Sequence, residues 1–260
     1  MKLNIKDINE LNIERSKEEL YKNGYTVLRN ILPISFLKEI EKEAVTISWS
    51  CMNKVEVNTI TTLNKCTLSS IHNLANYSKS FRSLYKSSDL RDIYNKLTGK
   101  RSDSNNMINS SYFFKQKESG RIKIHQDNAY FNLEDGISTL TFYIPVHYQS
   151  KNRGTIYYFS GTHKLGEFEH VAEGNIGASM CIKRKNITNK LSKHSIDYVE
   201  LFPGDISIHN ALVVHGTLAN QKDEPCEAFN FTLFDEENVI MKEKYLKYKS
   251  LLKHFLKGKH

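Results

Sequence analysis

The chain has 260 residues, of which 39% are hydrophobic and 25% are charged, a balance typical of a globular protein with a substantial core. The formal net charge is +8, yet residues 241–260 contain seven lysines and one glutamate and so carry +6 of it. The rest of the chain is close to neutral, and it has no zinc-finger, RNP-like or Gly-rich phosphate motif, so no nucleic-acid partner is expected.

Targeting signals and cysteine patterns are missing from the sequence. No apolar run approaches the length that spans a bilayer, and the first twenty residues mix charges instead of forming the apolar core of a signal peptide. We therefore expect a cytoplasmic protein without a transmembrane segment. The four cysteines, Cys51, Cys66, Cys181 and Cys226, show no CxxC pair and no zinc-like spacing, so we expect reduced thiols.

The N-terminal part is predicted to be mainly helical. Residues 14–24 and 35–47 show helical patterns, and the strand-like run Tyr25-Thr26-Val27-Leu28 lies between them. Three polar, poorly patterned segments are predicted to form loops over the mouth of a barrel: residues 48–87, 101–109 and 183–194. No Gly/Ser/Pro-rich linker is present, so we expect a single domain over residues 1–240, followed by a separate helix at 241–260.

From Tyr112 onward the sequence becomes rich in β-strand patterns. Short aromatic and β-branched runs at 112–114, 138–146 and 154–159 are separated by turn residues such as Ser160-Gly161 and Pro203-Gly204. This spacing predicts an antiparallel sandwich or barrel. The fold class is therefore mainly β: a double-stranded β-helix, or cupin-like jelly roll, with the N-terminal helices packed outside and a C-terminal helix.

A candidate metal site lies within this β-rich region. His125 and Asp127 form an HxD triplet, and His215 follows in the run Val-Val-His-Gly-Thr. On a strand, residues i and i+2 point to the same face, so His125 and Asp127 are expected to share one ion. Two imidazoles and one carboxylate form the facial triad of non-haem Fe(II) oxygenases. The aspartate also favours hydroxylation over halogenation, because a smaller residue would leave a coordination position for a halide.

Two alternatives remain open for these histidines. Any isolated histidine is about as often a structural residue as a metal ligand. His209 precedes His215 by six residues and competes with it for the role of second ligand; the His-Gly-Thr context favours His215, with His209 beside the ligands or in the core.

Several segments resemble the phytanoyl-CoA dioxygenase family. The likeness spans roughly residues 14 to 235 and keeps its order. The segments that carry it are HQDNAYF at 125–131, NRGTIYYFSGTHK at 152–164, GDISIHNALVVHGT at 204–217, ELYKNGYTVLRNILP at 19–33, and residues 89–99. The resemblance implies that His125, Asp127 and His215 are the iron ligands, that Tyr143 lies beside the metal, and that Asn230 contacts the co-substrate.

One position departs from the family pattern. The family usually has an arginine eleven residues after the second ligand histidine, where it pairs with the far carboxylate of 2-oxoglutarate. This chain has Cys226 there, and a thiol supplies no charge. Arg121 is the relocated cation that we favour, because a regular strand would place it on the face of the HxD residues. Lys123 would share that face, and Lys115, Arg153 and Lys222 are further candidates. Any of these cations, Arg121 included, is equally consistent with a surface charge.

The C-terminal segment is predicted to be a basic amphipathic helix. Its apolar stripe consists of Tyr245, Tyr248, Leu252 and Phe255, widened by Leu251 and Leu256. We favour docking of this stripe on the chain's own domain with the lysines outward. Binding to an anionic membrane, an acidic partner or nucleic acid is the alternative.

The sequence thus predicts an Fe(II)-dependent dioxygenase that uses O2, and 2-oxoglutarate as an uncertain co-substrate, to hydroxylate or otherwise oxidise a small molecule. Two other classes stay open. One is an iron oxygenase that does not use 2-oxoglutarate, and the other is a non-catalytic binding protein on the same fold. The substrate and the oligomeric state are not predicted.

Overall fold

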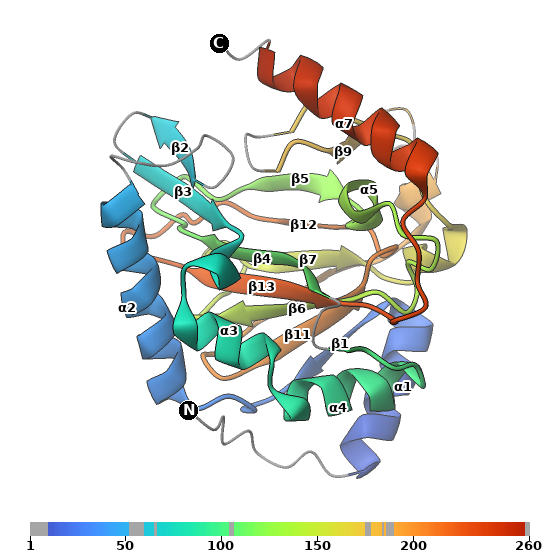
Figure 1. The fold of residues 1–260 in the computed structure, drawn as a ribbon, viewed down its shortest axis with the longest axis horizontal. Coiled ribbons are helices and arrows are strands. Elements are labelled where there is room, and N and C mark those ends of the chain that lie inside the picture. Colours follow the sequence, from blue (N-terminus) through green and yellow to red (C-terminus); the bar gives the residue numbers. More distant parts are fainter. Residues whose placement is uncertain are drawn as a thin grey trace.

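Two antiparallel sheets form the core of the computed structural model, which describes residues 10–51, 60–64, 67–103, 107–174, 178–183, 185 and 190–257 (Figure 1). The larger sheet has the order β1-β11-β6-β13-β4-β3-β2, and the smaller has the order β10-β7-β12-β5. The strands of the larger sheet are β1 (Tyr25–Leu28), β2 (Ile60–Asn64), β3 (Thr67–His72), β4 (Met107–Phe113), β6 (Leu140–Pro145), β11 (Ile206–Asn210) and β13 (Ala228–Leu233). Those of the smaller sheet are β5 (Ile122–His125), β7 (Ile156–Phe159), β10 (Ile196–Tyr198) and β12 (His215–Thr217).

Alternating side chains divide the larger sheet into an outer and an inner face. Phe142 and Phe231 point to the outer face, where their rings stack with centroids 4.9 Å apart. Tyr143 and Asn230, one residue along each strand, line a cavity that residues of the smaller sheet also line. The two sheets therefore face each other across this cavity, as in a jelly roll.

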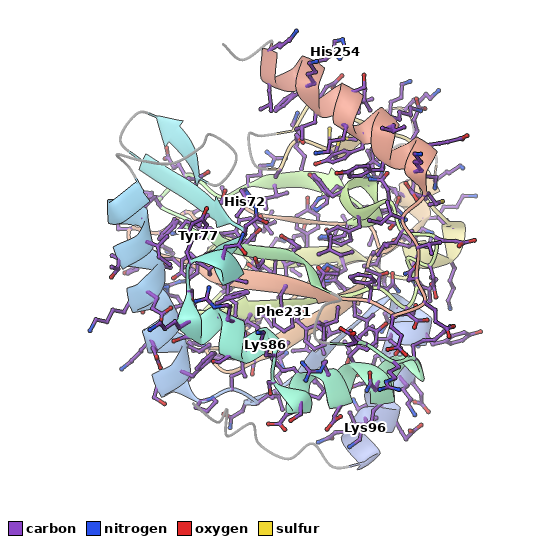
Figure 2. The ribbon with its side chains drawn as sticks, in the orientation of Figure 1. His72, Tyr77, Lys86, Lys96, Phe231 and His254 are labelled. Carbon is purple, nitrogen blue, oxygen red and sulfur yellow. The ribbon has the colours of Figure 1, made fainter. Side chains whose placement is uncertain are left out.

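Helices cover the outer face of the larger sheet. They are α2 (Ile34–Cys51), α3 (Lys79–Tyr85) and α4 (Ser88–Thr98), and their apolar residues share one core with β6, β11 and β13. Phe231, labelled in Figure 2, lies in this layer and meets the ring of Phe81 on α3 edge-on. Helix α1 (Glu10–Asn23) precedes β1, and α5 (Asn128–Phe131) is a single turn after β5.

The N-terminal predictions agree with the structure in order and differ in extent. Helix α1 begins at Glu10 and α2 runs to Cys51, so both are longer than predicted. Gly24 follows α1 with φ +85°, and a Cβ there would lie 2.6 Å from Nδ1 of His163. This residue therefore needs the conformational freedom of glycine to turn the chain into β1.

The segment 48–87 was wrongly predicted to be only a loop. It holds the end of α2, the hairpin β2–β3, a 3-10 turn at Leu74–Asn76 and α3. Strand β3 pairs with β4 and so extends the larger sheet toward the cavity. Parts of the predicted mouth segments, namely 52–59, 65–66, 104–106, 184 and 186–189, lie outside the described residues.

The remaining elements lie beside the smaller sheet. Short strands β8 (His170–Val171) and β9 (Cys181–Ile182) pair with each other, and 3-10 turns occupy Thr162–Leu165 and Leu191–Lys193. Helix α7 (Lys242–Lys257) crosses the edge of the molecule near α5 and β9 (Figure 1). Within the described parts of the chain, no helix combines the length and apolar character needed to cross a membrane.

Candidate metal centre

Strand pairing brings the two histidines of the predicted triad together. β12 pairs with β5 so that His215 lies directly opposite His125, and the two imidazole ring centroids are 4.3 Å apart. Directly opposed residues on antiparallel strands are close neighbours, although 90 residues separate these two along the chain. The register of this strand pair therefore builds half of the site.

Asp127 reaches the histidines from a turn and not from the strand on which we had expected it. β5 ends at His125, and Asp127 has helical backbone angles as the residue before α5. Its Oδ1 nevertheless lies 3.3 Å from Nε2 of His125 and 3.5 Å from Nε2 of His215. The sharp turn after His125 folds the carboxylate back over both rings, so the expected convergence is reached by different geometry.

Backbone carbonyls fix the orientation of both imidazole rings. Nδ1 of His125 lies 2.8 Å from the carbonyl of Lys123, and Nδ1 of His215 lies 3.0 Å from the carbonyl of Val213. Because a carbonyl only accepts, Nδ1 carries the hydrogen and donates it. Each Nε2 then presents its lone pair toward Asp127. This second hydrogen bond is the usual support of a metal-binding histidine.

The second oxygen of Asp127 is also held in place. The hydroxyl of Thr141 donates to Oδ2 at 2.7 Å, and Nε2 of His209 lies 3.2 Å from the same atom. His209 is in turn 3.0 Å from the hydroxyl of Tyr158 through Nδ1. His209 thus contacts Oδ2 of the carboxylate, and Oδ1 is left facing His125 and His215.

The protonation of the site suits a cation. Burial raises the pKa of Asp127, but the adjacent His215 and the contacts with His125 and His209 lower it, and the net pKa lies well below its usual value. Burial, His125 and His209 together lower the pKa of His215 well below its usual value, so its ring is neutral. A neutral imidazole and a buried carboxylate are the protonation states that metal binding requires.

The three residues fit a divalent transition metal. One ligand atom from each of His125, Asp127 and His215 lies within 4.8 Å of the others, and all three residues are buried. Two imidazole nitrogens and one carboxylate oxygen on one side of an ion match the facial triad of non-haem iron sites. The open side of this group faces the cavity.

The cavity beside the triad has a volume of about 470 Å³. That size lies within the range of small-molecule sites. Its wall on the larger sheet is polar: Nδ1 of His72 is 2.9 Å from the hydroxyl of Ser111, Ser111 donates to Asn109, and Asn109 is 3.3 Å from Asn230. Burial lowers the pKa of His72 to about 4, so this histidine is neutral.

The predicted co-substrate residues fall into two groups. Tyr143 and Asn230 both line the cavity, together with the three ligands. Arg121 is exposed and lies outside the cavity lining, so its role as an anchor stays a prediction. Lys123 is exposed as well, and its ammonium group donates to the carbonyl of Glu173.

Helix α7 covers one side of the cavity. Tyr248, Lys249, Leu252 and Leu256 line it, although no residue of α7 is fully buried. The ring of Tyr248 meets Tyr130 edge-on with centroids 6.1 Å apart, and Lys244 pairs with Glu167 at 3.1 Å. The apolar stripe of the C-terminal segment thus packs against the mouth of the site.

A buried cation lies behind Tyr143. The ammonium group of Lys115 is 3.1 Å from the Tyr143 hydroxyl, and the lysine is only 1% exposed. Burial lowers its pKa to about 8. Cys226 is buried nearby with its thiol donating to the carbonyl of Arg153, and burial raises the pKa of this thiol. Cys226 is therefore a neutral side chain next to a buried lysine.

Sequence reasoning missed the polar wall and the degree of burial of Lys115. His72 and Ser111 lie in segments with no recognisable motif, and only strand pairing between β3 and β4 brings them together. The signal for Lys115 is weak but present, because it is the one lysine directly after the apolar run Tyr-Phe-Phe at 112–114.

A second cluster of possible ligands lies outside this cavity. Glu41, His147 and Glu227 also place ligand atoms within 4.8 Å of one another. Two of them are only partly buried, and each already has a partner: His147 contacts Glu41 at 3.3 Å, and Glu227 accepts from Tyr112. None of these three residues lines the cavity beside the triad, so the HxD site is the stronger candidate metal centre.

Comparison with solved structures gives the same fold. A non-haem α-ketoglutarate-dependent carbocyclase, SnoK from nogalamycin biosynthesis, aligns with a TM-score of 0.73 and 16% identity, covering 90% of this chain and 87% of its own. The epimerase SnoN from the same biosynthesis aligns with a TM-score of 0.69 and 17% identity, covering 88% of this chain and 85% of its own. EctD from S. alaskensis with bound Fe aligns with a TM-score of 0.70 and 17% identity, covering 90% of this chain and 80% of its own. At this level of identity the likeness establishes the jelly-roll fold.

Sequence comparison establishes the family. No curated protein matches the chain. Residues 20–225, however, match the sequence profile of the phytanoyl-CoA dioxygenase family, and this range contains His125, Asp127 and His215. Because the match covers most of the chain and includes the whole triad, the protein belongs to the phytanoyl-CoA dioxygenase family.

Proposed function

We propose that the protein is an Fe(II)- and 2-oxoglutarate-dependent oxygenase that hydroxylates or otherwise oxidises a C–H bond of a small molecule. The observation that carries the proposal is the convergence of His125, Asp127 and His215, with both Nε2 atoms turned toward Oδ1 of the carboxylate. A purely structural cluster would not require both imidazoles to carry the hydrogen on Nδ1 and to line a cavity.

The family and the structural neighbours support this reading. The family is one of dioxygenases. The similar structures include EctD with 2-oxoglutarate and 5-hydroxyectoine, and SnoN with Fe³⁺, α-ketoglutarate and nogalamycin RO. Because these neighbours include an epimerase and a carbocyclase, the fold is compatible with several outcomes at a C–H bond.

Each residue of the site has a distinct task in this proposal. His125 and His215 supply neutral Nε2 donors, and their Nδ1–H groups stay bonded to Lys123 and Val213. Asp127 supplies Oδ1 while Thr141 and His209 hold Oδ2. The ligands are thus oriented before the metal arrives, which reduces the conformational freedom lost on binding.

The cavity supplies the substrate site. Bound iron with 2-oxoglutarate and O2 would supply the oxidising chemistry, in which the decarboxylation of 2-oxoglutarate to succinate and CO2 would take up one oxygen atom and the oxidation of the C–H bond would use the other. The protein's contribution is to position the substrate and limit access of water. Tyr130 and Leu252 provide apolar walls, and His72 and Asn109 provide neutral polar groups for a substrate with hydroxyl or carbonyl functions.

Anaerobic metal loading tests the proposal. The protein is loaded with Fe(II) without O2 and titrated with 2-oxoglutarate, and the visible metal-to-ligand charge-transfer band of the chelate is recorded. We expect one iron per chain and a saturable band. Asp127→Ala should lose both, since it removes the anionic ligand, whereas His163→Ala, a buried histidine outside the cavity, should keep both.

The titration also separates the alternatives. Cys226 motivates an iron oxygenase without 2-oxoglutarate, and that enzyme would bind Fe(II) and give no band. A non-catalytic binding protein would bind no iron while remaining folded. Either result would contradict the proposed function, and the circular dichroism of the sample would establish that the chain is folded.

A further inference from the structure

The inference concerns Lys115, which is fixed next to Cys226 by the backbone. The carbonyl of Lys115 accepts the Cys226 N–H at 3.2 Å and a side-chain N–H of Asn220 at 3.0 Å. Lys115 therefore lies beside the position where the resemblance places an arginine, on the chain that continues from β4. Its side chain is 1% exposed.

The stem of Lys115 lies in a slot formed by two glycines. A Cβ on Gly120 would lie 2.4 Å from Cγ of Lys115, and a Cβ on Gly154 would lie 3.2 Å from its Cδ. Both glycines have positive φ, +79° and +62°. Larger residues at these positions would displace the lysine, so the local backbone is shaped to hold the side chain in this buried position.

The Lys115 ammonium group has only neutral partners. It donates to the carbonyl of Gly154 at 2.6 Å and to the hydroxyl of Tyr143 at 3.1 Å, and it makes no ion pair with any residue in the described parts of the chain. An ammonium group has three hydrogens, so one donor is left over. Keeping a buried charge without an opposite charge destabilises a fold, and such a group next to a cavity is a candidate for a functional role.

Tyr143 connects this cation to the metal cavity. Its hydroxyl accepts from Lys115 and donates to Gln149 at 3.0 Å, and its side chain lines the cavity with His125, Asp127 and His215. The other cations of this region are placed differently: Arg153 lies over the ring of Tyr148 and near Glu224. Lys115 is thus the buried cation that adjoins the cavity through a single hydroxyl.

We propose that Lys115, together with the Tyr143 hydroxyl, binds the distal carboxylate of 2-oxoglutarate and replaces the arginine that is missing at Cys226. This inference rests on the proposed function and names the residue that makes the co-substrate fit this chain. The ammonium group uses its free donor, and Tyr143 turns its hydroxyl from Gln149 to the carboxylate. The neutral thiol of Cys226 supplies no charge, so in this proposal the positive charge comes from Lys115.

The test compares two oxo-acids that differ only at the distal end. 2-Oxoglutarate and 2-oxopentanoate have the same chain length and the same metal-chelating group, but 2-oxopentanoate ends in a methyl group. Both are titrated into the anaerobic Fe(II)-loaded protein, and the charge-transfer band gives each dissociation constant. The variants are Lys115→Met, which keeps the length of the stem without the charge, Tyr143→Phe, and Arg121→Met as the exposed-cation control.

We expect Lys115→Met to weaken 2-oxoglutarate binding by roughly 10- to 100-fold, the effect of losing one charge-assisted hydrogen bond. Binding of 2-oxopentanoate and of Fe(II) should not change. Tyr143→Phe should weaken 2-oxoglutarate selectively and by less, and Arg121→Met should have no effect. A purely structural role of Lys115 would weaken both oxo-acids equally.

Besides equal weakening of both oxo-acids by Lys115→Met, three further results would overturn the inference. The first is an unchanged dissociation constant for 2-oxoglutarate in Lys115→Met while the wild type gives a normal band, which leaves the proposed function intact. The second is a selective loss in Arg121→Met. The third is a wild-type protein that binds both oxo-acids with equal affinity. This comparison does not depend on the folding of any variant. A wild type that binds Fe(II) and gives no band with 2-oxoglutarate would contradict the proposed function itself.

Discussion

At the scale of single residues, the proposed metal centre depends on atoms that would not touch the metal. The Nδ1–H bonds to the carbonyls of Lys123 and Val213 decide which nitrogen of His125 and of His215 faces Asp127. The bond from Thr141 decides which oxygen of Asp127 remains available. Such supporting contacts typically change metal affinity by about 10- to 100-fold.

Thr141→Val tests this support. Valine keeps the shape of the side chain and removes the hydroxyl that donates to Oδ2 of Asp127. We expect Fe(II) affinity, measured by anaerobic equilibrium titration, to fall by roughly tenfold or more. Thr155→Val, which removes a buried hydroxyl bonded to the carbonyl of Val199, is the matched control and should leave the affinity unchanged. Equal affinities in all three proteins would show that Thr141 does not support the ligand.

The buried lysine also predicts a pH dependence of stability. The pKa of Lys115 is lowered from 10.5 to about 8 in the folded protein, so between these values the unfolded chain binds more protons and stability rises with pH. Lys115→Met removes this dependence. The gain in unfolding free energy from the substitution should be greatest below pH 8, at most about 3 kcal/mol, and should shrink toward pH 10.5. Urea unfolding of both apo proteins across this range measures it.

A gain that does not vary with pH would contradict this account of Lys115. Lys115→Met is also expected to lose affinity for 2-oxoglutarate. Lys115 would then destabilise the apo protein and stabilise the complex with 2-oxoglutarate. That combination distinguishes a binding residue from one retained for packing.

The residue scale also shows what the sequence could predict. His125, Asp127 and His215 are identifiable because their chemistry and spacing are specific, and the structure brings them together. The burial of Lys115 is not identifiable, because it arises from Gly120, Gly154 and the segment that carries Cys226, just before β13, which are distant from one another in the sequence.

At the scale of elements, helix α7 illustrates the same limit. The apolar stripe in residues 241–260 predicts a helix, and the structure has one at Lys242–Lys257. Periodicity cannot say what the stripe covers, since own-domain docking and partner binding need the same pattern. The structure places Tyr248 and Leu252 on the cavity. The division into a domain at 1–240 and a separate helix stays a prediction.

Disrupting this contact should release α7 without unfolding the domain. Tyr248→Ala and Leu252→Ala together remove half-buried side chains that line the cavity. Losing this burial should raise the open population of α7 by about tenfold or more. Trypsin cleavage at the lysines of α7, followed by mass spectrometry, measures the change. Leu246→Ala, on the same helix but 58% exposed, should cleave at the wild-type rate.

Two outcomes would contradict the docking of α7. One is wild-type cleavage in the double variant. The other is equal acceleration by Leu246→Ala, which would indicate a loss of helix stability and not of the contact with the cavity.

At the scale of the whole molecule, the two faces of the larger sheet have different roles. The outer face of the larger sheet packs against α2, α3 and α4, and the inner face builds the site with the smaller sheet. The aromatic and β-branched run at 138–146 predicts a strand, and the structure has β6 there, buried along its whole length. The addition of β2 and β3 to the sheet is not readable, because the segment 48–87 has no regular pattern.

The outer core should carry stability and not activity. Phe231→Ala removes a fully buried ring that stacks on Phe142. We expect a loss of about 3–5 kcal/mol in the free energy of unfolding by urea titration. Phe202→Ala, at a 52% exposed position, is the control and should cost much less. A small loss for Phe231→Ala would mean that the helices do not pack on the sheet as described.

The central claim is that His125, Asp127 and His215 hold iron and that the co-substrate reaches Lys115. The most direct measurement is a crystal structure of the protein loaded anaerobically with Fe(II) and 2-oxoglutarate, with anomalous diffraction recorded at the iron edge. The account predicts one iron peak bound by Nε2 of both histidines and a carboxylate oxygen of Asp127, with the distal carboxylate of 2-oxoglutarate at the Lys115 ammonium group. An iron bound through His209 instead of His215, or no iron in this cavity, would contradict it.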